Sequence, residues 1–299
     1  MPTGRIVKAL SGYYYVQPDD ETQEEWITCR ARGLFKKKGL SPLVGDQVTY
    51  ELSNETEGTV TEIKLPRKSE LVRPPMANAE VAVLVFSVTE PSLNLQLLDK
   101  FLVHIESAGL DALICLTKSD LANEEEQACY EQAEQLYRQI GYDVYVTSSK
   151  EGTGVAAIHQ ALEGKIGVFA GQSGVGKSSL LNCLLPGLNL ETNAISQKLG
   201  RGKHTTRHVE LIPLPGQAWM ADTPGFSQLD FMQVEAEELS GCFPEFRALA
   251  ASCKFRGCQH NGEPKCQVMN AVEQGEVSRS RYDHYLYFLQ EIKDKKRRY

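Results

Sequence analysis

The sequence predicts a multidomain protein with an N-terminal β-barrel, a central α/β domain and a C-terminal, mainly helical segment that binds a metal. Three observations carry this fold class: short β-like runs before residue 65, apolar strands alternating with longer helices from residue 78, and three cysteines crowded around one histidine after residue 250. Strands that alternate with helices indicate a mainly parallel sheet covered on both faces. The expected domains are residues 1–70, 71–233 and 234–299.

The predicted barrel rests on β-like runs that turn-forming residues separate, at residues 4–10, 13–17, 25–32, 46–52 and 58–63. Short strands at such close spacing are typical of a compact barrel of the OB type, whose sheet face binds oligonucleotides. The segment also carries aromatic residues suited to base stacking and a basic run, namely Tyr13, Tyr14, Tyr15, Trp26, Phe35 and Lys36 to Lys38. Alternation turns Tyr14 away from Tyr13 and Tyr15, so some of these tyrosines belong to the core.

Composition and charge limit the function classes. The chain has 299 residues, of which 41% are hydrophobic and 24% charged, and these fractions exclude a disordered or collagen-like protein. The longest apolar run, Val81 to Phe86, is too short to span a membrane, and the first residues carry no secretory signal. We therefore expect a cytoplasmic protein without a membrane partner. The net charge of −7 argues against nucleic acid, but basic residues concentrate at Lys36 to Lys38 and in the last seven residues.

A phosphate-binding loop is predicted after an apolar strand and before a helix, the context that its pattern G-x-x-x-x-G-K-[ST] requires. The loop comprises Gly171, Gln172, Ser173, Gly174, Val175, Gly176, Lys177 and Ser178, and we add the adjacent Ser179. Backbone N–H groups at a helix N-terminus cradle phosphates in such a loop. Lys177 would contact the β- and γ-phosphates, and the Ser178 hydroxyl would ligate Mg²⁺. The sequence thus predicts a nucleotide site.

Two further motifs, each at the end of an apolar strand, indicate that the base is guanine. They comprise Thr117, Lys118, Ser119 and Asp120, and Ser148, Ser149 and Lys150. The Asp120 carboxylate can accept hydrogen bonds from N1–H and the 2-amino group of guanine, whereas adenine has an acceptor at N1 and no 2-amino group. The methylene stem of Lys118 can lie along the purine face. The segment 148–150 can bring a backbone N–H to O6.

The sequence DTPG supplies Asp222, which can hold Mg²⁺ through water, and Gly225, whose N–H can bind the γ-phosphate. Residues 200–207 are polar and glycine-rich, and Thr206 could cap Mg²⁺ in the triphosphate state. Directly after DTPG, many GTPases carry a glutamine that orients the attacking water, and here that residue is Phe226. We expect His204 to orient the water, with Thr206 and Lys177 as the other catalytic residues. The alternative for His204 is a contact to a phosphate of an RNA partner.

These motifs are those of a translation-factor-type GTPase in an unusual order, because the guanine motifs precede the phosphate-binding loop. Over essentially its whole length the chain resembles the RsgA family of circularly permuted, small-ribosomal-subunit biogenesis GTPases. The resemblance implies a GTP hydrolase that binds GTP and GDP, docks on the small ribosomal subunit and its rRNA, and assists late maturation of that subunit. We also expect a monomer, and turnover that the small subunit stimulates because Phe226 cannot orient the water. Thr117 stands where GTPases usually carry asparagine, and we expect it to weaken a supporting contact while Asp120 still selects guanine.

The C-terminal cluster comprises Cys253, Cys258, His260 and Cys266. In a reducing compartment such thiols favour a metal over disulfides, and Cys₃His is the ligand set of a closed tetrahedral zinc site. Four protein ligands leave no position for a reactive water, so the Zn²⁺ should fold the segment. The RsgA resemblance assigns the same ligands. The alternative is four unrelated buried residues.

Two other functions remain open from the sequence. One is a GTP-gated, rRNA-binding assembly factor in which nucleotide occupancy is the signal and turnover is incidental. The other is a P-loop ATPase or kinase, which Asp120 argues against. Hydrolysis with and without small subunits separates the first alternative from a GTP hydrolase, and competition by ATP tests the second.

Overall fold

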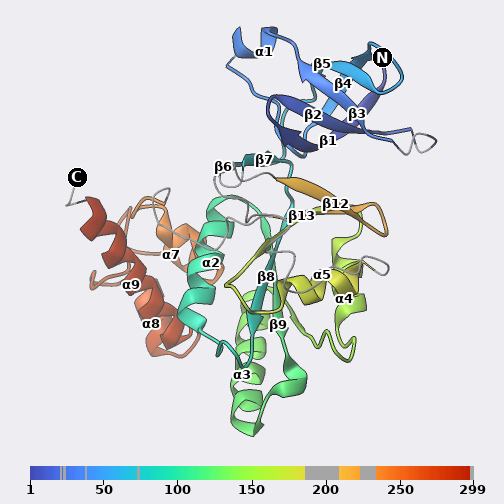
Figure 1. The fold of residues 1–299 in the computed structure, drawn as a ribbon. Coiled ribbons are helices and arrows are strands. Elements are labelled where there is room, and N and C mark those ends of the chain that lie inside the picture. Colours follow the sequence, from blue (N-terminus) through green and yellow to red (C-terminus); the bar gives the residue numbers. More distant parts are fainter. Residues whose placement is uncertain are drawn as a thin grey trace. The chain divides into compact units, whose positions relative to one another are not determined.

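The computed structural model describes residues 1–20, 22, 25–37, 39–72, 75–185, 209–222 and 234–296, without the side chains of residues 36, 222 and 296. The chain forms two compact units, whose elements are labelled in Figure 1. One comprises Met1–Ala82, Val155–Ala170 and Lys177–Ser227, and the other comprises Val83–Gly154, Gly171–Gly176 and Gln228–Tyr299. The domain boundaries expected after residues 70 and 233 stay predictions.

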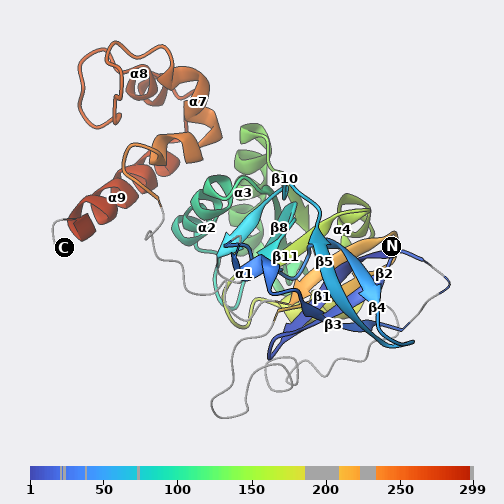
Figure 2. The ribbon, with the colours of Figure 1, turned by 90° about the horizontal axis from the view of Figure 1, so that it is seen from above.

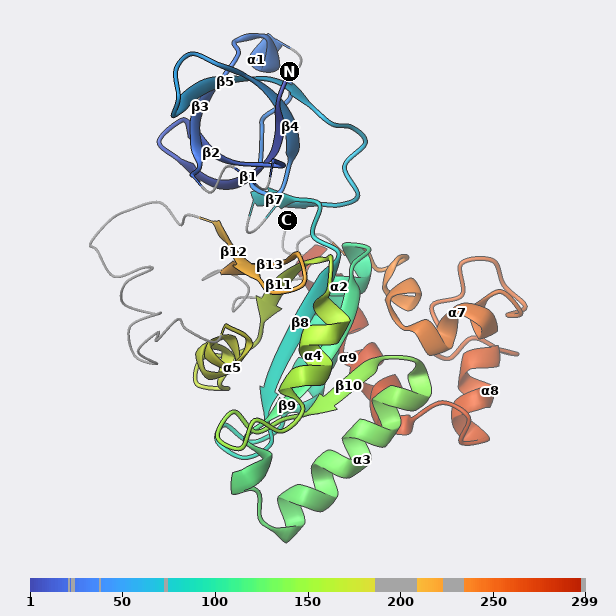
Figure 3. The same cartoon turned by 90° about the vertical axis from the view of Figure 1, so that its right-hand side faces the viewer.

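A closed five-stranded barrel begins the first unit. Its strands are β1 (Thr3–Leu10), β2 (Tyr13–Pro18), β3 (Ile27–Ala31), β4 (Gln47–Leu52) and β5 (Glu57–Ile63). They pair in the order β1-β2-β3-β5-β4, and β4 pairs back with β1, so that the strands form the ring seen end-on in Figure 3. Closure removes the free sheet edges at which other chains could pair. The predicted barrel is confirmed, with a short helix α1 (Leu34–Lys37) between β3 and β4.

The α/β part of the first unit consists of β11 (Ile166–Ala170), β12 (Glu210–Leu214), β13 (Ala218–Asp222), α4 (Val155–Leu162) and α5 (Lys177–Leu184). Strand β13 is parallel to β11, as a mainly parallel sheet requires, but β12 is antiparallel to β13. The connection between β12 and β13 is too short for the crossover that parallel strands need. Gly216 and Gln217 in this connection have φ values of 74° and 57°, the left-handed backbone of a tight hairpin.

A separate two-stranded ribbon pairs β6 (Glu70–Val72) with β7 (Pro75–Ala77).

The second unit contains β9 (Asp111–Thr117), β10 (Asp143–Val146) and, from Val83 on, β8 (Val81–Ser87), in the order β10-β9-β8. Every residue of β8 is buried, as in a strand that is covered on both faces. Helices α2 (Leu95–Ser107) and α3 (Glu124–Ile140) belong to this layer, and the 3-10 helix η1 (Ser119–Leu121) follows β9. The start of α3 is fixed locally, because Asn123 and Glu126 form a reciprocal capping box.

The C-terminal segment of the second unit is helical, as predicted (Figure 2). It contains η2 (Leu239–Cys242), α7 (Pro244–Ala250), α8 (Gln267–Glu273) and α9 (Arg279–Lys296). Its core is aromatic, with the ring of Phe246 5.0 Å from that of Phe243 and 5.1 Å from that of Tyr285. Within the described residues, none of the helices combines the length and apolar character of a membrane span.

Candidate functional site

The phosphate-binding loop follows the buried strand β11 and leads into α5, as the sequence predicts. Gly171 has a φ of 137°, and a Cβ atom at this position would lie 2.2 Å from the carbonyl oxygen of Val85 in β8. Any side chain would therefore push the loop away from the strand. Gly176 has a φ of 95°, which again favours glycine, and its ideal Cβ position is 3.5 Å from Thr117 Oγ1. These two glycines let the loop run close to β8 and to the end of β9.

Thr117 connects the predicted guanine motif to the predicted phosphate-binding loop. It is 2% exposed, and its hydroxyl donates to the carbonyl oxygen of Val175 at 2.5 Å, with the Phe86 carbonyl oxygen 3.2 Å away. A buried hydroxyl needs such a partner, because burial of an unsatisfied donor is costly. The expected weakening of a supporting contact stays a prediction, and the threonine hydroxyl makes a short hydrogen bond here. The contact fixes the register between the two motifs.

Asp120 lies in η1, half-buried, and its carboxylate is oriented by a serine from the neighbouring loop. The hydroxyl of Ser148, a fully buried residue, donates to Asp120 Oδ1 at 2.7 Å. Ser148 is itself held, because its hydroxyl accepts the backbone N–H of Glu151 at 3.2 Å. Within the described residues the Asp120 carboxylate makes no second hydrogen bond, so it retains acceptor sites for a ligand that presents two adjacent donors.

The loops after β8, β9 and β10 are also tied to one another. Ser119 donates from both its backbone N–H and its hydroxyl to the carbonyl oxygen of Thr147, each at 3.2 Å. Lys118 adopts a left-handed backbone with a φ of 62°, and its Nζ donates to the carbonyl oxygen of Glu90. The stem of Lys118 thus extends from the end of β9 to the loop after β8. The structure therefore brings both predicted guanine motifs and the residues 171–176 together in one unit.

Other predicted site residues are placed less completely. Lys177, Ser178 and Ser179 begin α5, and Ser149 and exposed Lys150 follow Ser148. Asp222 is the last residue of β13, but its side chain is not among the described ones. The predicted His204, Thr206 and Gly225 lie outside the described residues.

The four predicted metal ligands gather at one point. Their ligand atoms all lie within 4.8 Å of one another, and His260 Nδ1 is 3.3 Å from Cys266 Sγ and 3.7 Å from Cys253 Sγ. In a tetrahedral zinc site the usual bond lengths put a nitrogen about 3.6 Å, and a second sulfur about 3.8 Å, from each sulfur. The observed nitrogen-to-sulfur distances match this spacing. The cluster is compatible with one zinc ion.

The protein core holds the cluster in place. The hydroxyls of Tyr282 and Tyr285 on α9 donate to the carbonyl oxygens of His260 and Gln259, both at 2.7 Å. Burial lowers the pKa of His260 and so favours the neutral imidazole that metals bind. Burial raises the pKa of the Cys258 thiol to about 12, so that metal binding must displace a proton from it.

The barrel aromatics separate into core and surface residues, a distinction that alternation alone does not make. Phe35 is 8% exposed and belongs to the core, whereas Tyr13 is 36% exposed. The Arg30 guanidinium lies over the Tyr13 ring, 4.7 Å from its centre. Tyr15 and Trp26 make an edge-to-face pair with ring centres 6.4 Å apart. Tyr13 with Arg30 is therefore the barrel pair best suited to stack on a base.

The sequence analysis did not predict a buried ionic cluster that joins helices α2 and α3 to the C-terminal helices α7 and α9. Asp99 on α2 is fully buried and accepts from Arg281 Nη1 and from the Tyr137 hydroxyl, both at 2.6 Å. Arg281, 1% exposed, also makes a two-pronged contact with Glu245 on α7 at 2.8 and 2.9 Å. His284 Nδ1 lies 2.5 Å from the second Asp99 oxygen. Burial lowers the pKa of Arg281, but Asp99 and Glu245 outweigh this effect and raise it, so the guanidinium stays charged.

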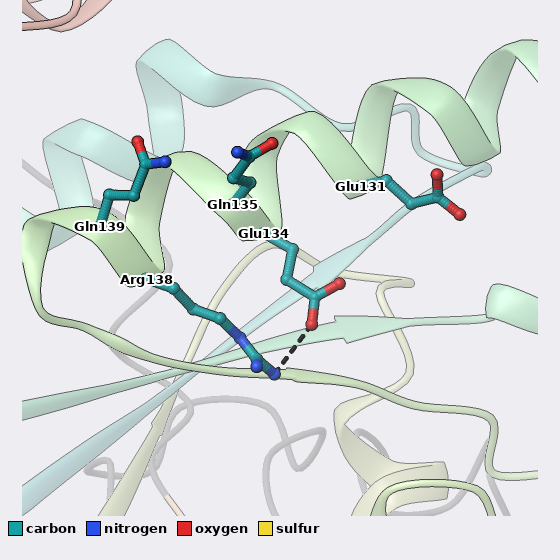
Figure 4. Close-up of a pocket in the computed structure, with 5 residues that line it drawn as sticks. All are labelled: Glu131, Glu134, Gln135, Arg138 and Gln139. Atoms are coloured by element: carbon teal, nitrogen blue, oxygen red, sulfur yellow. Dashed lines mark ion pairs between the residues drawn. The ribbon is translucent and has the colours of Figure 1, made fainter.

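A shallow hollow of about 450 Å³ on α3 is not part of this site (Figure 4). Its lining residues share one polar face of the helix: Glu131, Glu134, Gln135, Arg138 and Gln139. Glu134 and Arg138 form an i,i+4 ion pair at 2.8 Å across it. None of the predicted nucleotide or metal ligands lines this hollow. We interpret it as part of the solvated face of the amphipathic helix α3.

Comparisons with known proteins bear on the whole chain. Residues 64–232 match the family model described as RsgA GTPase, and residues 3–60 match the RsgA N-terminal domain. A Bacillus velezensis protein named small ribosomal subunit biogenesis GTPase RsgA is 56% identical over 301 residues, and a Bacillus subtilis protein of the same name is 54% identical over 300, with 100% of both chains covered in each case.

Two solved structures are similar as well. The crystal structure of YloQ, described as a circularly permuted GTPase, is 48% identical with a TM-score of 0.84 and covers 99% of this chain and 96% of its own. The crystal structure of YjeQ from Thermotoga maritima is 35% identical with a TM-score of 0.86 and covers 97% of this chain and 98% of its own.

Proposed function

Because this chain belongs to the RsgA GTPase family, we propose that it binds the small ribosomal subunit through rRNA and assists the late maturation of that subunit. The chain is a circularly permuted GTPase that converts GTP to GDP and phosphate. One observation supports the nucleotide site of this GTPase most strongly: the Thr117 hydroxyl joins the predicted guanine motif directly to Val175 of the phosphate-binding loop. A base contact and a phosphate contact can thus be made to the same nucleotide.

In the proposed site, Asp120 reads guanine, Lys118 flanks the base, and the segment of Ser148, Ser149 and Lys150 provides the contact to O6. The loop from Gly171 to Ser179 holds the phosphates, with Lys177 against the β- and γ-phosphates. Ser178, Thr206 and Asp222 would hold Mg²⁺, which neutralises charge on the β- and γ-oxygens. Gly225 would bind the γ-phosphate through its N–H. The free carboxylate acceptors of Asp120 and the exposed position of residues Gln172 to Gly174 support this assignment.

The subunit contacts are assigned to the two terminal segments, residues 1–70 and 234–299, which flank the GTPase segment 71–233. The Tyr13–Arg30 pair on the barrel supports the first assignment, because cation-flanked aromatics suit single-stranded nucleic acid. We further propose that the protein acts as a monomer in the cytoplasm, where its substrate subunit is assembled.

Hydrolysis should depend on the subunit. Phe226 cannot orient a water molecule, so we assign that role to His204, in a site that the small subunit completes. His204→Ala should lower the subunit-stimulated rate of GTP hydrolysis by about 100-fold, because a misplaced nucleophile loses its alignment. Multiple-turnover phosphate release with and without purified small subunits measures this rate.

The same variant should bind GTP and subunits with wild-type affinity. A wild-type stimulated rate would show that another group orients the water. Loss of subunit binding would assign His204 to an rRNA phosphate contact instead.

We also propose that Cys253, Cys258, His260 and Cys266 hold one structural Zn²⁺. Cys258→Ser should lower the zinc content from one ion per chain to near zero and speed hydrogen exchange throughout residues 234–296, while GTP affinity is retained. Cys129→Ser removes an exposed cysteine on α3 and is the matched control. Metal analysis that finds no zinc in the wild-type protein would refute the proposal.

A further inference from the structure

The loop between the first two metal ligands displays a phenylalanine that the core does not use. Four phenylalanines lie in the described C-terminal segment, and three of them, Phe243, Phe246 and Phe288, are fully buried. The fourth, Phe255, is 43% exposed. A single exposed apolar residue is ordinary on a protein surface, so its surroundings decide whether it has a function.

Phe255 stands between two cationic residues in the sequence. Lys254 and Arg256 are exposed, and Lys254 Nζ lies 5.1 Å from the centre of the Phe255 ring. Lys265, also exposed, adds a third positive charge within the metal-binding loops. The single carboxylate between residues 251 and 266 belongs to Glu263, and it is turned onto the backbone, where it accepts the N–H groups of Gln259 at 2.9 Å and Asn261 at 2.6 Å.

The loop that presents the ring is fixed from several directions. Cys253 and Cys258 bracket it as metal ligands, and the Cys258 N–H closes a turn onto the carbonyl oxygen of Phe255 at 3.3 Å. The following residues Gln259 and His260 are anchored to the tyrosines of α9. A ring held on such a scaffold loses little conformational freedom when it binds a partner.

We propose that Lys254, Phe255 and Arg256 form an RNA-binding site in which the Phe255 ring stacks on an unpaired nucleotide and the two cations contact its flanking phosphates. This inference rests on the proposed binding of the small ribosomal subunit and assigns one contact within it. An exposed aromatic ring with a cation over it and a second exposed cation next in sequence, beside a carboxylate that backbone donors occupy, fits a stacked base and its polyanionic backbone. An apolar protein surface would leave the charges of Lys254 and Arg256 without partners, and an acidic one would make no use of the exposed ring.

Phe255→Ala should weaken the affinity of the full-length, GTP-analogue-bound protein for small subunits by about 5- to 100-fold, the usual cost of losing one stacked base. Phe255→Leu should lose as much, since it keeps apolar bulk without a π face, and Phe255→Tyr should retain wild-type affinity. Tyr287→Ala is the matched control. Tyr287 on α9 is an aromatic residue with 58% exposure, but its sequence neighbours are the uncharged Leu286 and Phe288 and not two cations. It should bind as the wild type does.

Lys254→Ala and Arg256→Ala should each lower the slope of log affinity against log salt concentration by about one, whereas Phe255→Ala should leave that slope unchanged. A photoreactive benzoylphenylalanine at position 255 should crosslink to rRNA. Zinc content measured for each variant confirms that the loop is intact.

The outcomes separate this inference from the proposed function. Wild-type protein that fails to bind small subunits overturns both. Wild-type protein that binds, together with Phe255→Ala or Phe255→Leu protein that binds equally well at full zinc content, overturns the stacking site alone. A crosslink from position 255 exclusively to a ribosomal protein overturns it as well.

Discussion

Asp120→Asn is expected to lower the affinity for GTP by at least about 100-fold and to create affinity for xanthosine triphosphate. In the proposed site the carboxylate accepts from two donors of guanine, and each hydrogen bond to a charged group contributes about 1.5–3 kcal/mol. An amide places its own donor against the 2-amino group, which costs binding, but the same donor matches the 2-oxo group of xanthine. Titration with fluorescent GTP and xanthosine triphosphate analogues measures both effects.

Two variants sharpen this test. Asp111→Asn changes an exposed aspartate at the opposite end of β9 and should alter neither affinity. Ser148→Ala removes the hydroxyl that orients the Asp120 carboxylate at 2.7 Å, so it should weaken GTP binding without any gain for the xanthine nucleotide. Unchanged GTP affinity in Asp120→Asn would mean that this carboxylate does not read the base.

Asp99→Asn should destabilise the attachment of α9 to α2 by about 3–5 kcal/mol. Removal of one member of a buried ion pair leaves the other charge uncompensated, and among the described residues Glu245 is the charged partner that buried Arg281 would keep. Hydrogen exchange of the α9 amides reports the free energy of this local opening. The effect should not extend to the barrel strands, which belong to the other unit.

The same helix offers the matched control. Arg279 and Asp283 form an exposed ion pair at 2.9 Å on α9, and Asp283→Asn should change the opening free energy by less than about 0.5 kcal/mol. The double variant Asp99→Leu with Arg281→Met should recover much of the loss, because apolar residues of similar size can replace a buried pair. Exchange in Asp99→Asn that equals the wild type would show that the cluster contributes no net stability.

A feature of this protein could be predicted from the sequence when the residues that form it lie close together in the chain. The phosphate-binding loop and the Cys₃His cluster are contiguous or nearly so, and their residue types are dictated by chemistry, so both could be located before the structure. The antiparallel β12–β13 pair was also encoded locally, in the short turn at Gly216 and Gln217. That signal competed with the expectation of parallel strands.

Contacts between distant residues could not be predicted in the same way. Thr117 and Val175 are 58 positions apart, and Asp99 and Arg281 are 182 apart. Nothing in the local pattern of an aspartate on an amphipathic helix marks it as buried, because such residues are usually solvated. Equally, Phe255 and Phe246 have similar local surroundings in sequence, and only the packed core shows that one is exposed and the other is not.

The central claim is that one guanine-specific site, built from the Asp120 motif and the phosphate-binding loop, performs the hydrolysis that the small ribosomal subunit stimulates. Multiple-turnover hydrolysis by Asp120→Asn, with GTP and with xanthosine triphosphate in the presence of small subunits, tests it most directly. The account predicts that subunits stimulate the variant with xanthosine triphosphate and not with GTP, the reverse of the wild-type preference. Stimulated GTP hydrolysis at the wild-type rate in this variant would contradict it.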